Sequence, residues 1–195
     1  MSALNRVFQL IAEAETSDPI LARVILREIK AELTDVQAAC DASLMDSLTG
    51  LPTRQVGELM LRRSAAAWSR GDVTHRIVMI DMDGLKNVND SGGHEKGDEF
   101  LADLGTALRT SIRPCDFVCR WGGDEFLIIL EFPEQAGSDI SMASEERVRR
   151  RVKKATYTDF SWGSFALDDG SPRGIRNSVA KADRAMFLNK KARKG

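Results

Sequence analysis

The hydrophobic positions along this chain fall into short continuous runs and longer stretches with helical spacing. The aliphatic run at 76–81 predicts a buried strand, and the run at 160–167 predicts another. Two further runs, 117–121 and 126–130, flank a Gly-Gly pair and predict a β-hairpin. Both glycines are expected at positive φ, because the central residues of a tight type I′ turn need it. We therefore expect a sheet that contains this hairpin.

Apolar residues three or four positions apart mark the helices that should cover the sheet. In the stretch 97–112, which follows a Gly-Gly loop at 92–93, Phe100, Leu104 and Leu108 lie on one face. The order strand, helix, hairpin, helix, strand predicts an α+β fold with helices packed on a mainly antiparallel sheet. The helices predicted for this part of the chain span 53–70, 97–112, 144–155 and 175–191.

The N-terminal residues form a separate helical segment, 1–43, ahead of a main domain at 44–195. Residues 3–15 predict a short amphipathic helix. A longer helix follows Pro19 and runs to about Leu44, since proline suits the first turn of a helix. Its apolar positions recur as heptads, so this face should pack on the main domain, on the first helix or on a second copy of the chain. The heptad positions are Ala22, Leu26, Ile29, Leu33, Val36 and Cys40.

Composition and charge exclude several classes of protein. With 195 residues, 43% of them hydrophobic, the chain can fill one normal core, so disorder is not expected. The net charge of −1 argues against binding of a nucleic acid polymer, which needs a basic stripe. The odd number and the spacing of Cys40, Cys115 and Cys119 predict free thiols rather than disulfides or a zinc site. The sequence shows neither a signal pattern nor an apolar run of the roughly 18 residues that span a membrane, so we expect a soluble cytoplasmic protein.

Two carboxylates follow the Gly-Gly pair and open the second strand of the hairpin. Asp124 and Glu125 lie directly before the apolar run that begins at Phe126. An acid pair at the start of an apolar strand is costly unless it binds something. A hard cation held by oxygen ligands is the natural partner.

A second acidic pair ends the first predicted strand. Asp81 and Asp83 should point to one side, since side chains along a strand alternate with period two. The two acidic pairs converge if their strands are neighbours, and they would then hold a divalent metal and a phosphate substrate. The alternative is that these acids only cap turns.

With both acidic pairs in place, the chain from about residue 44 onward resembles the GGDEF domain, the catalytic domain of diguanylate cyclases. The family signature stands intact at 122–126, as Gly-Gly-Asp-Glu-Phe. Residues 46–54 resemble the family's opening motif, and 81–98 resemble its metal and guanine segment. The resemblance implies a fold similar to the polymerase palm and to the class III nucleotide cyclases, here with an N-terminal helical stalk.

The resemblance implies a reaction in which two GTP molecules condense to cyclic di-GMP with loss of two pyrophosphates. Each step is attack of a ribose 3′-hydroxyl on an α-phosphorus, aided by Mg²⁺ or Mn²⁺, with two ions implied per site. The implied metal ligands are Asp81, Asp124 and the carbonyl of Met82. The implied catalytic residues are Asp124, as a metal-assisted proton acceptor, and Glu125.

The resemblance also assigns residues to the substrate. Asn89 and Asp98 match the positions that read guanine. Independently of the family, a carboxylate can accept from the N1–H and the exocyclic amine of guanine, a donor pair that adenine lacks. Asp98 also suits a helix N-terminus, where the helix dipole stabilises an acid. Lys86 and Lys190 are implied to contact phosphate. His94 is a further implied substrate residue, for which a role in a turn is the alternative. Gly122 and Gly123 are implied to let a nucleotide approach the backbone closely.

Arg113 and Asp116 match the family's Arg-x-x-Asp product site. An arginine can grip a phosphate or a guanine edge through its planar fork, and the acid can accept from guanine. We therefore expect feedback inhibition by cyclic di-GMP. Because two active sites must face each other, the resemblance also implies a homodimer, and we favour the helices of 1–43 as its stalk.

Several positions depart from the family pattern. Thr53 stands where Asn is usual, Leu85 where Phe is usual, and Trp162 where a small aliphatic residue is usual. The basic tail at 190–195 is a loose version of the family's ending and leaves the second phosphate contact open. None of these departures affects an implied metal ligand.

Two other functions stay open at the level of sequence. One is a non-catalytic receptor that binds cyclic di-GMP through Arg113 and Asp116. The other is a cyclase that makes a different or mixed dinucleotide, against which Asp98 argues. The sequence names neither the input signal nor the downstream receptor.

Overall fold

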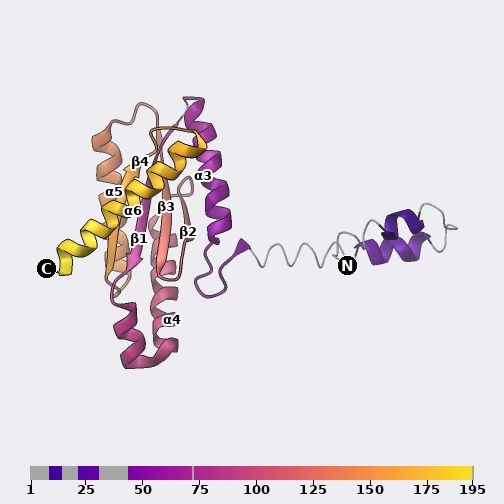
Figure 1. Ribbon diagram of the computed structural model, residues 1–195, viewed down its shortest axis with the longest axis horizontal. Helices are drawn as coiled ribbons and strands as arrows, with labels where there is room; N and C mark the ends of the chain where they lie inside the picture. Colours follow the sequence, from indigo (N-terminus) through magenta and orange to yellow (C-terminus); the bar gives the residue numbers. More distant parts are fainter. Residues whose placement is uncertain (1–8, 15–21, 31–43, 72, 195) are drawn as a thin grey trace. The chain divides into compact units, whose positions relative to one another are not determined.

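The computed structural model describes residues 9–14, 22–30, 44–71 and 73–194, and it separates into two compact units. The first unit is Met1–Leu44 and the second is Met45–Gly195. Figure 1 shows the elements of each unit along the chain.

A four-stranded sheet forms the centre of the second unit, with the strand order β2-β3-β1-β4. All three strand pairs are antiparallel. The two central strands are apolar on both faces because helices cover both sides, which explains why their sequences read as continuous runs. The expected α+β fold with a mainly antiparallel sheet is therefore confirmed. The strands are β1 (Val73–Met82), β2 (Phe117–Arg120), β3 (Glu125–Pro133) and β4 (Phe160–Ala166).

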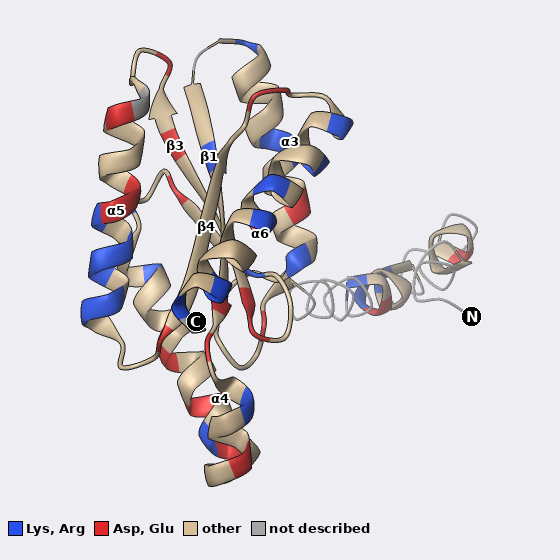
Figure 2. Ribbon diagram, turned by 60° about the vertical axis from the view of Figure 1, so that its left-hand side comes forward, with Lys and Arg blue, Asp and Glu red and all other residues tan. Residues whose placement is uncertain are grey.

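Four helices flank this sheet, and each face has its own core cluster. On one face, Ile80 of β1 clusters with Leu104 of α4 (Leu85–Ser111) and Val152 of α5 (Ser138–Ala155). On the other face, Met79 of β1 clusters with residues of the remaining two helices, and Figure 2 shows these helices on the side opposite α5. The two helices are α3 (Arg54–Ser69) and α6 (Pro172–Lys194), which contribute Leu61, Ala65, Ala182 and Met186.

Several elements extend beyond the ranges predicted from the sequence. β1 begins at Val73 rather than at residue 76, and α5 begins at Ser138 rather than at residue 144. The break predicted at Gly92 and Gly93 is present but short: α4 consists of two helical segments that meet at a kink, where Gly93 has the non-helical angles φ 80° and ψ 172°. The segment of α4 before this kink projects beyond the strand ends (magenta in Figure 1).

The hairpin of β2 and β3 is confirmed, but the predicted type I′ turn is wrong. Neither Gly122 nor Gly123 has a positive φ. Instead, the N–H groups of Trp121 and Gly122 both donate to the carbonyl of Glu125, at 2.8 and 3.1 Å. These bonds close a wider loop over residues 121–124, which needs no left-handed residue.

Gly163 sets how closely α6 lies on β4. A Cβ at this position would lie 1.9 Å from the backbone N of Met186 and 2.5 Å from the carbonyl oxygen of Ala182. Only glycine allows this approach. The close contact fixes the height of α6 above the sheet and hence the position of its last turns.

In the first unit, residues 9–14 and 22–30 are helical, within the two helices predicted there. Leu10 packs with Ile25 and Ile29 in a small buried cluster. Ile29 is one of the predicted heptad positions, whereas Leu26 remains 57% exposed. The positions Leu33, Val36 and Cys40 lie outside the described residues, so the partner of the heptad face stays a prediction. Among the described helices, none has the combination of length and apolar character that crossing a bilayer requires.

Candidate active site

The two acidic pairs meet at one end of the central strands. Asp81 and Glu125 are paired across β1 and β3. Beside them, the N–H of Met82 donates to the carbonyl of Asp124 at 2.9 Å, which extends the ladder by one bond. Because β1 and β3 are neighbours in the sheet, both acidic pairs lie at the same end of the central strands, as expected for neighbouring strands.

Burial and mutual repulsion raise the pKa values of two acids at the strand ends. Burial raises the pKa of the Asp81 carboxyl, and Asp124 and Asp83 raise it further, while Lys190 opposes the rise. Burial also raises the pKa of Glu125, and the neighbouring carboxylates Asp183, Asp124 and Asp81 add to the effect. Such a cluster gains stability from a bound cation.

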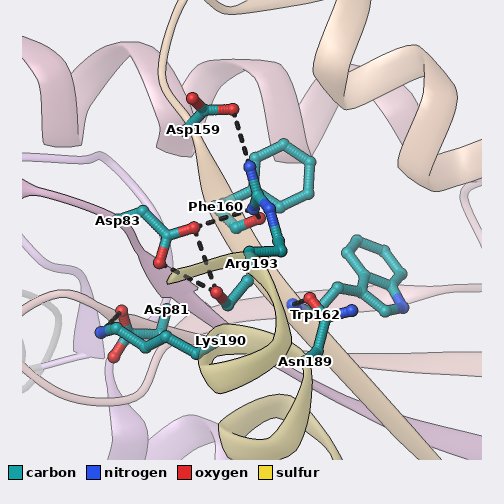
Figure 3. A network of polar contacts seen from close by, with 9 residues as sticks. Asp81, Asp83, Asp159, Phe160, Trp162, Asn189, Lys190 and Arg193 are labelled. Carbon is teal, nitrogen blue, oxygen red and sulfur yellow. Dashed lines mark hydrogen bonds and ion pairs between the residues drawn. The ribbon is translucent and has the colours of Figure 1, made fainter. Parts of the chain in front are cut away.

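Lys190 is the basic group closest to this cluster in the described part of the chain. Its Nζ donates to Oδ1 of Asp81 at 2.5 Å (Figure 3). A cavity of about 500 Å³ lies here, with carboxylates and lysines on its walls. Acids that can bind metal thus stand beside a lysine that can bind phosphate. The lining residues are Asp81, Glu125, Asp183, Met186, Phe187, Lys190 and Lys191.

The second acid of the first pair is already engaged by the protein. Oδ1 and Oδ2 of Asp83 accept from the hydroxyl of Ser161 at 2.9 and 3.0 Å. Oδ2 also accepts from Arg193 at 2.8 Å. Asp81 and Asp83 do face the same side, toward α6, but only Asp81 borders the cavity.

The donor set at the strand ends fits a hard divalent ion. The implied ligands Asp81, Asp124 and the Met82 carbonyl offer only oxygen atoms, which Mg²⁺ prefers. Among the described residues, no group of three or more His, Cys, Asp or Glu side chains has the geometry of a metal site. Water or substrate oxygens would therefore have to complete the coordination, as is common for Mg²⁺.

The residues of α4 that are implied in binding the substrate lie on both sides of its kink. Lys86, His94 and Asp98 are exposed, the last two beyond the kink at Gly93. No hydrogen bond is recorded between these described side chains and Asp81 or Glu125. The structure thus places them on one helix but does not join them to the acids.

Asn89 is the exception on α4, because its side chain is partly enclosed. Its Oδ1 is buried without a hydrogen-bond partner. A Cβ on Gly97 would lie 1.9 Å from this oxygen, so Asn89 can lie here only because residue 97 is glycine. An unpaired buried amide oxygen is a group that a ligand donor could satisfy.

Arg113 and Asp116 lie together in the turn between α4 and β2. The Asp116 side chain is 0% exposed and accepts from the backbone N–H groups of Arg113 and Glu131, at 2.9 and 3.1 Å. It also accepts from Nε and Nη2 of Arg113, at 3.2 and 3.3 Å. These donors saturate the carboxylate, so the expected role of Asp116 as an acceptor for guanine does not fit its position here.

Arg113 itself keeps an accessible surface. Its side chain is 37% exposed. Nη2 donates to the carbonyl of Glu131 at 3.0 Å, and the guanidinium lies 5.5 Å from the centroid of the Phe132 ring. Hydrogen bonding to Asp116 raises the pKa of Arg113 above its ordinary value, against the effect of burial. The arginine is therefore held in one orientation by the acid beneath it.

Sequence reasoning missed a second arginine, Arg120, which joins the opening motif to the signature loop. Its Nη1 donates to Oδ1 and Oδ2 of Asp46, both at 3.0 Å. Its Nε and Nη2 donate to the carbonyl of Gly123 at 3.2 and 2.6 Å. Its own N–H donates to the carbonyl of Pro52 at 2.9 Å. Asp46 lies in the opening motif and Arg120 lies two positions before the signature, but nothing in their separation along the chain indicates that they pair.

Trp162, one of the departures from the family pattern, has a specific partner. Its indole N–H donates to Oε1 of Glu145 at 2.7 Å. Oε2 of Glu145 accepts from Arg76 at 2.9 Å and from Ser164 at 2.7 Å. The tryptophan therefore takes part in a polar network that ties α5 to β1 and β4.

The fold and the strand-end acids together define an α+β domain with an acidic site at one edge of an antiparallel sheet. Residues 43–195 match the family model described as "Diguanylate cyclase, GGDEF domain". The chain belongs to this GGDEF family of diguanylate cyclases.

The relatives extend beyond the length of this chain. It is 30% identical over 175 residues to the diguanylate cyclase DosC of Escherichia coli, an alignment that covers 86% of this chain but 36% of DosC. Among solved structures it is similar to the Pseudomonas aeruginosa diguanylate cyclase SiaD, solved with its activator SiaC, with 29% identity, a TM-score of 0.67, and coverage of 96% and 72% of the two chains. The coiled coil and GGDEF domain of Caulobacter crescentus DgcB, solved with cyclic di-GMP, shares the fold at 22% identity and a TM-score of 0.75, with coverage of 90% and 96%.

Proposed function

We propose that this protein is an active diguanylate cyclase that condenses two GTP molecules into cyclic di-GMP. The observation that carries the proposal is the meeting of Asp81 and Glu125, with Lys190 beside them, at the edge of an intact signature loop. Membership of a family named for this activity supports it. Relatives that have lost function commonly lose such acids, whereas this chain keeps them.

The reaction forms one bond and breaks one at each step. The ribose 3′-oxygen attacks the α-phosphorus, the bond to the pyrophosphate oxygen breaks, and the hydroxyl proton leaves to a base. Divalent ions, when bound, supply positive charge to the attacking and the leaving oxygens. Asp81, Asp124 and the Met82 carbonyl would hold them, and Asp124 would accept the proton. Glu125 would add negative charge that strengthens the binding of these ions.

The remaining residues bind and orient the nucleotide. Lys190 would exchange its bond to Asp81 for a phosphate oxygen once a cation neutralises that acid. Lys86 would contact the phosphates from the start of α4. Asn89, with its unpaired Oδ1, and Asp98 would read the donor edge of guanine.

A single nucleotide per subunit requires two subunits for each product molecule. We therefore propose that the active form is a homodimer whose sites face each other, with the helices of residues 1–43 as the stalk. We also propose that Arg113 binds the product and mediates feedback inhibition, with Asp116 holding the arginine rather than touching the ligand.

The test is product formation from GTP and Mg²⁺, resolved by chromatography, by the wild-type protein and by Asp124→Asn. We expect cyclic di-GMP from the wild type and a loss of about 10²-fold to 10³-fold in the variant, as for removal of a group that stabilises a transition state. The matched control is Asp103→Asn, which neutralises an exposed acid on α4 and should keep full activity. Equal turnover by Asp124→Asn would refute the assigned site.

The second candidate is a receptor that binds cyclic di-GMP without making it. The partly exposed Arg113, held by a buried acid, is the observation that favours it. Tight binding of added cyclic di-GMP by a wild-type protein that makes no product would establish the receptor and overturn the cyclase.

A further inference from the structure

The last turns of α6 carry two basic side chains on one face, Lys190 and Arg193. Residues three apart on a helix are neighbours on its surface. Lys190 reaches Asp81, and Arg193 reaches the second acid of the same strand end, Asp83 (Figure 3). The spacing of the two acids along the strand thus matches the spacing of the two cations along the helix.

Arg193 joins three segments that are distant in the sequence. Its Nη1 donates to Oδ2 of Asp83 at 2.8 Å and to the carbonyl of Phe160 at 2.5 Å. Its Nη2 donates to Oδ1 of Asp159 at 3.0 Å. The backbone N–H of Asp83 also donates to the carbonyl of Asp159, at 2.9 Å. The end of β1, the start of β4 and the end of α6 are therefore held at one point.

The hydrogen bonds of Arg193 within the protein argue against a direct contact between this residue and the substrate. Both terminal nitrogens already have acceptors within the protein, and the side chain is 32% exposed. A basic tail residue in a nucleotide-binding domain could contact phosphate directly, but here the guanidinium is directed at Asp83 and Asp159. Lys190 and Lys191 line the cavity beside Asp81, whereas Arg193 does not.

Asp83 lies at the junction between β1 and α4. It is followed by Gly84, which has a φ of 77° and stands directly before the first residue of α4. Ser161 and Arg193 hold the carboxylate of Asp83 from two sides. Whatever fixes Asp83 therefore also fixes where α4 begins, and with it the positions of Lys86 and Asn89.

We propose that Arg193 is a positioning residue for the nucleotide site. It keeps the end of α6 on the sheet so that Lys190 reaches the cavity beside Asp81. It also holds Asp83, which fixes the position of the first residues of α4. It does not itself bind phosphate. This inference rests on the proposed function, because it concerns the placement of groups that would bind GTP.

The test compares Arg193→Gln, Arg193→Lys, Asp83→Asn and the double variant Asp83→Asn/Arg193→Gln. The probe is a GTP analogue with a methylene group between the α- and β-phosphates, in Mg²⁺, with binding measured by calorimetry. KM and kcat for GTP and the amide hydrogen exchange of residues 186–193 are measured alongside. The matched control is Lys181→Gln, which lies earlier on α6 and removes the ion pair of Lys181 with Asp168.

We expect Arg193→Gln to weaken binding of the analogue and to raise KM by about threefold to tenfold, with kcat changed by less than about twofold, since a misplaced lysine costs a fraction of one charged contact. Exchange over 186–193 should rise in parallel. Asp83→Asn should reproduce part of this effect, and the double variant should be no worse than Arg193→Gln, because both remove the same contact. Arg193→Lys should restore part of the affinity, and Lys181→Gln should bind as the wild type does.

Two results would overturn the inference while leaving the proposed function intact. Binding by Arg193→Gln equal to that of the wild type would show that the contact positions nothing. Additive losses in the double variant would show that Arg193 acts independently of Asp83. A wild-type protein that binds no analogue would overturn the proposed function itself, and the positioning role with it.

Discussion

Arg120 donates through Nη1 to both carboxylate oxygens of Asp46, each at 3.0 Å, across 74 positions of sequence. The same guanidinium donates to the carbonyl of Gly123 in the signature loop. One side chain therefore connects the first turn of the second unit to the loop that carries Asp124 and Glu125. The opening motif and the signature loop are therefore in direct contact through this arginine.

This pair predicts an effect of pH on stability. Burial alone raises the pKa of Asp46, but hydrogen bonds from Thr49 and Arg120 bring it below its ordinary value. A carboxyl whose pKa is lowered on folding stabilises the fold above its unfolded pKa of about 3.9, and this contribution is lost as the pH falls further. Asp46→Asn should cost about 1–3 kcal/mol at pH 7, measured by urea unfolding, as for other hydrogen bonds to charged groups.

The same comparison at low pH provides the control for that prediction. The difference in stability between the wild type and Asp46→Asn should stay constant from pH 7 to about pH 5 and shrink as the pH falls below about 4, through the lowered pKa of the folded Asp46. A difference that does not shrink between about pH 4 and pH 2 would contradict the assigned ion pair.

The contact of α6 with β4 predicts that Gly163 tolerates no side chain. Gly163→Ala places a Cβ against the backbone of Met186, which cannot rotate away as a side chain can. We expect a loss of about 1–3 kcal/mol in the free energy of unfolding, typical of overpacking. The control is Gly137→Ala, since no atom lies within 4 Å of its added Cβ and its φ of −58° suits alanine. Equal stabilities for the two variants would mean that α6 is not seated as described.

The two residues of the Arg-x-x-Asp site should respond differently to mutation. Asp116→Ala leaves the part-buried N–H groups of Arg113 and Glu131 without an acceptor, so we expect a loss of stability of about 2–3 kcal/mol, seen as a lower midpoint of thermal unfolding. Arg113→Ala removes the side-chain donors of the buried Asp116 carboxylate but keeps both backbone donors, so we expect a smaller loss of about 1–2 kcal/mol.

In the proposed cyclase, Arg113→Ala should also remove inhibition by added cyclic di-GMP while turnover is kept. Arg109→Ala, an exposed arginine near the end of α4, is the control and should stay inhibited. If inhibition persists in Arg113→Ala, the product binds elsewhere.

The crowded acids at the strand ends predict that Glu125 lowers the stability of the protein when no metal is bound. Glu125 is surrounded by Asp183, Asp124 and Asp81, which raise its pKa in addition to burial. Glu125→Gln removes this repulsion and should raise the thermal midpoint without metal by about 1–3 °C, since contributions of this kind are below about 1 kcal/mol. Mg²⁺ should raise the midpoint of the wild type more than that of the variant. A lower midpoint for Glu125→Gln would show that the glutamate has a stabilising partner instead.

The proposed stalk predicts that activity depends on protein concentration. Removing residues 1–43 leaves the unit from Met45 onward, which is compact by itself. We expect lower specific activity at low protein concentration, because the subunits then meet only by diffusion, with a partial recovery as the concentration is raised. Unchanged specific activity over the whole range would argue against a stalk.

The strands and their acids were accessible to sequence reasoning because their signals are local. A continuous aliphatic run such as 76–81 can be recognised from neighbouring residues alone, and Asp81 and Asp124 are located by the runs that they border. The turn at Gly122 and Gly123 was misjudged, since glycine permits a positive φ but does not require it. The bonds to the Glu125 carbonyl, which depend on how β3 enters the sheet, selected the wider loop.

The sequence by itself determined the elements, their order, the family and two of the acids that border the cavity, Asp81 and Glu125, because each of these depends on residue type and short spacing. Only the tertiary structure decided the partners of those residues. Asp83 pairs with Arg193 across 110 positions, and Asp116 is buried and accepts from two backbone N–H groups and from the Arg113 side chain. Such contacts depend on how the helices lie on the sheet, for example on the approach that Gly163 allows, and side-chain spacing along the chain carries no record of that packing.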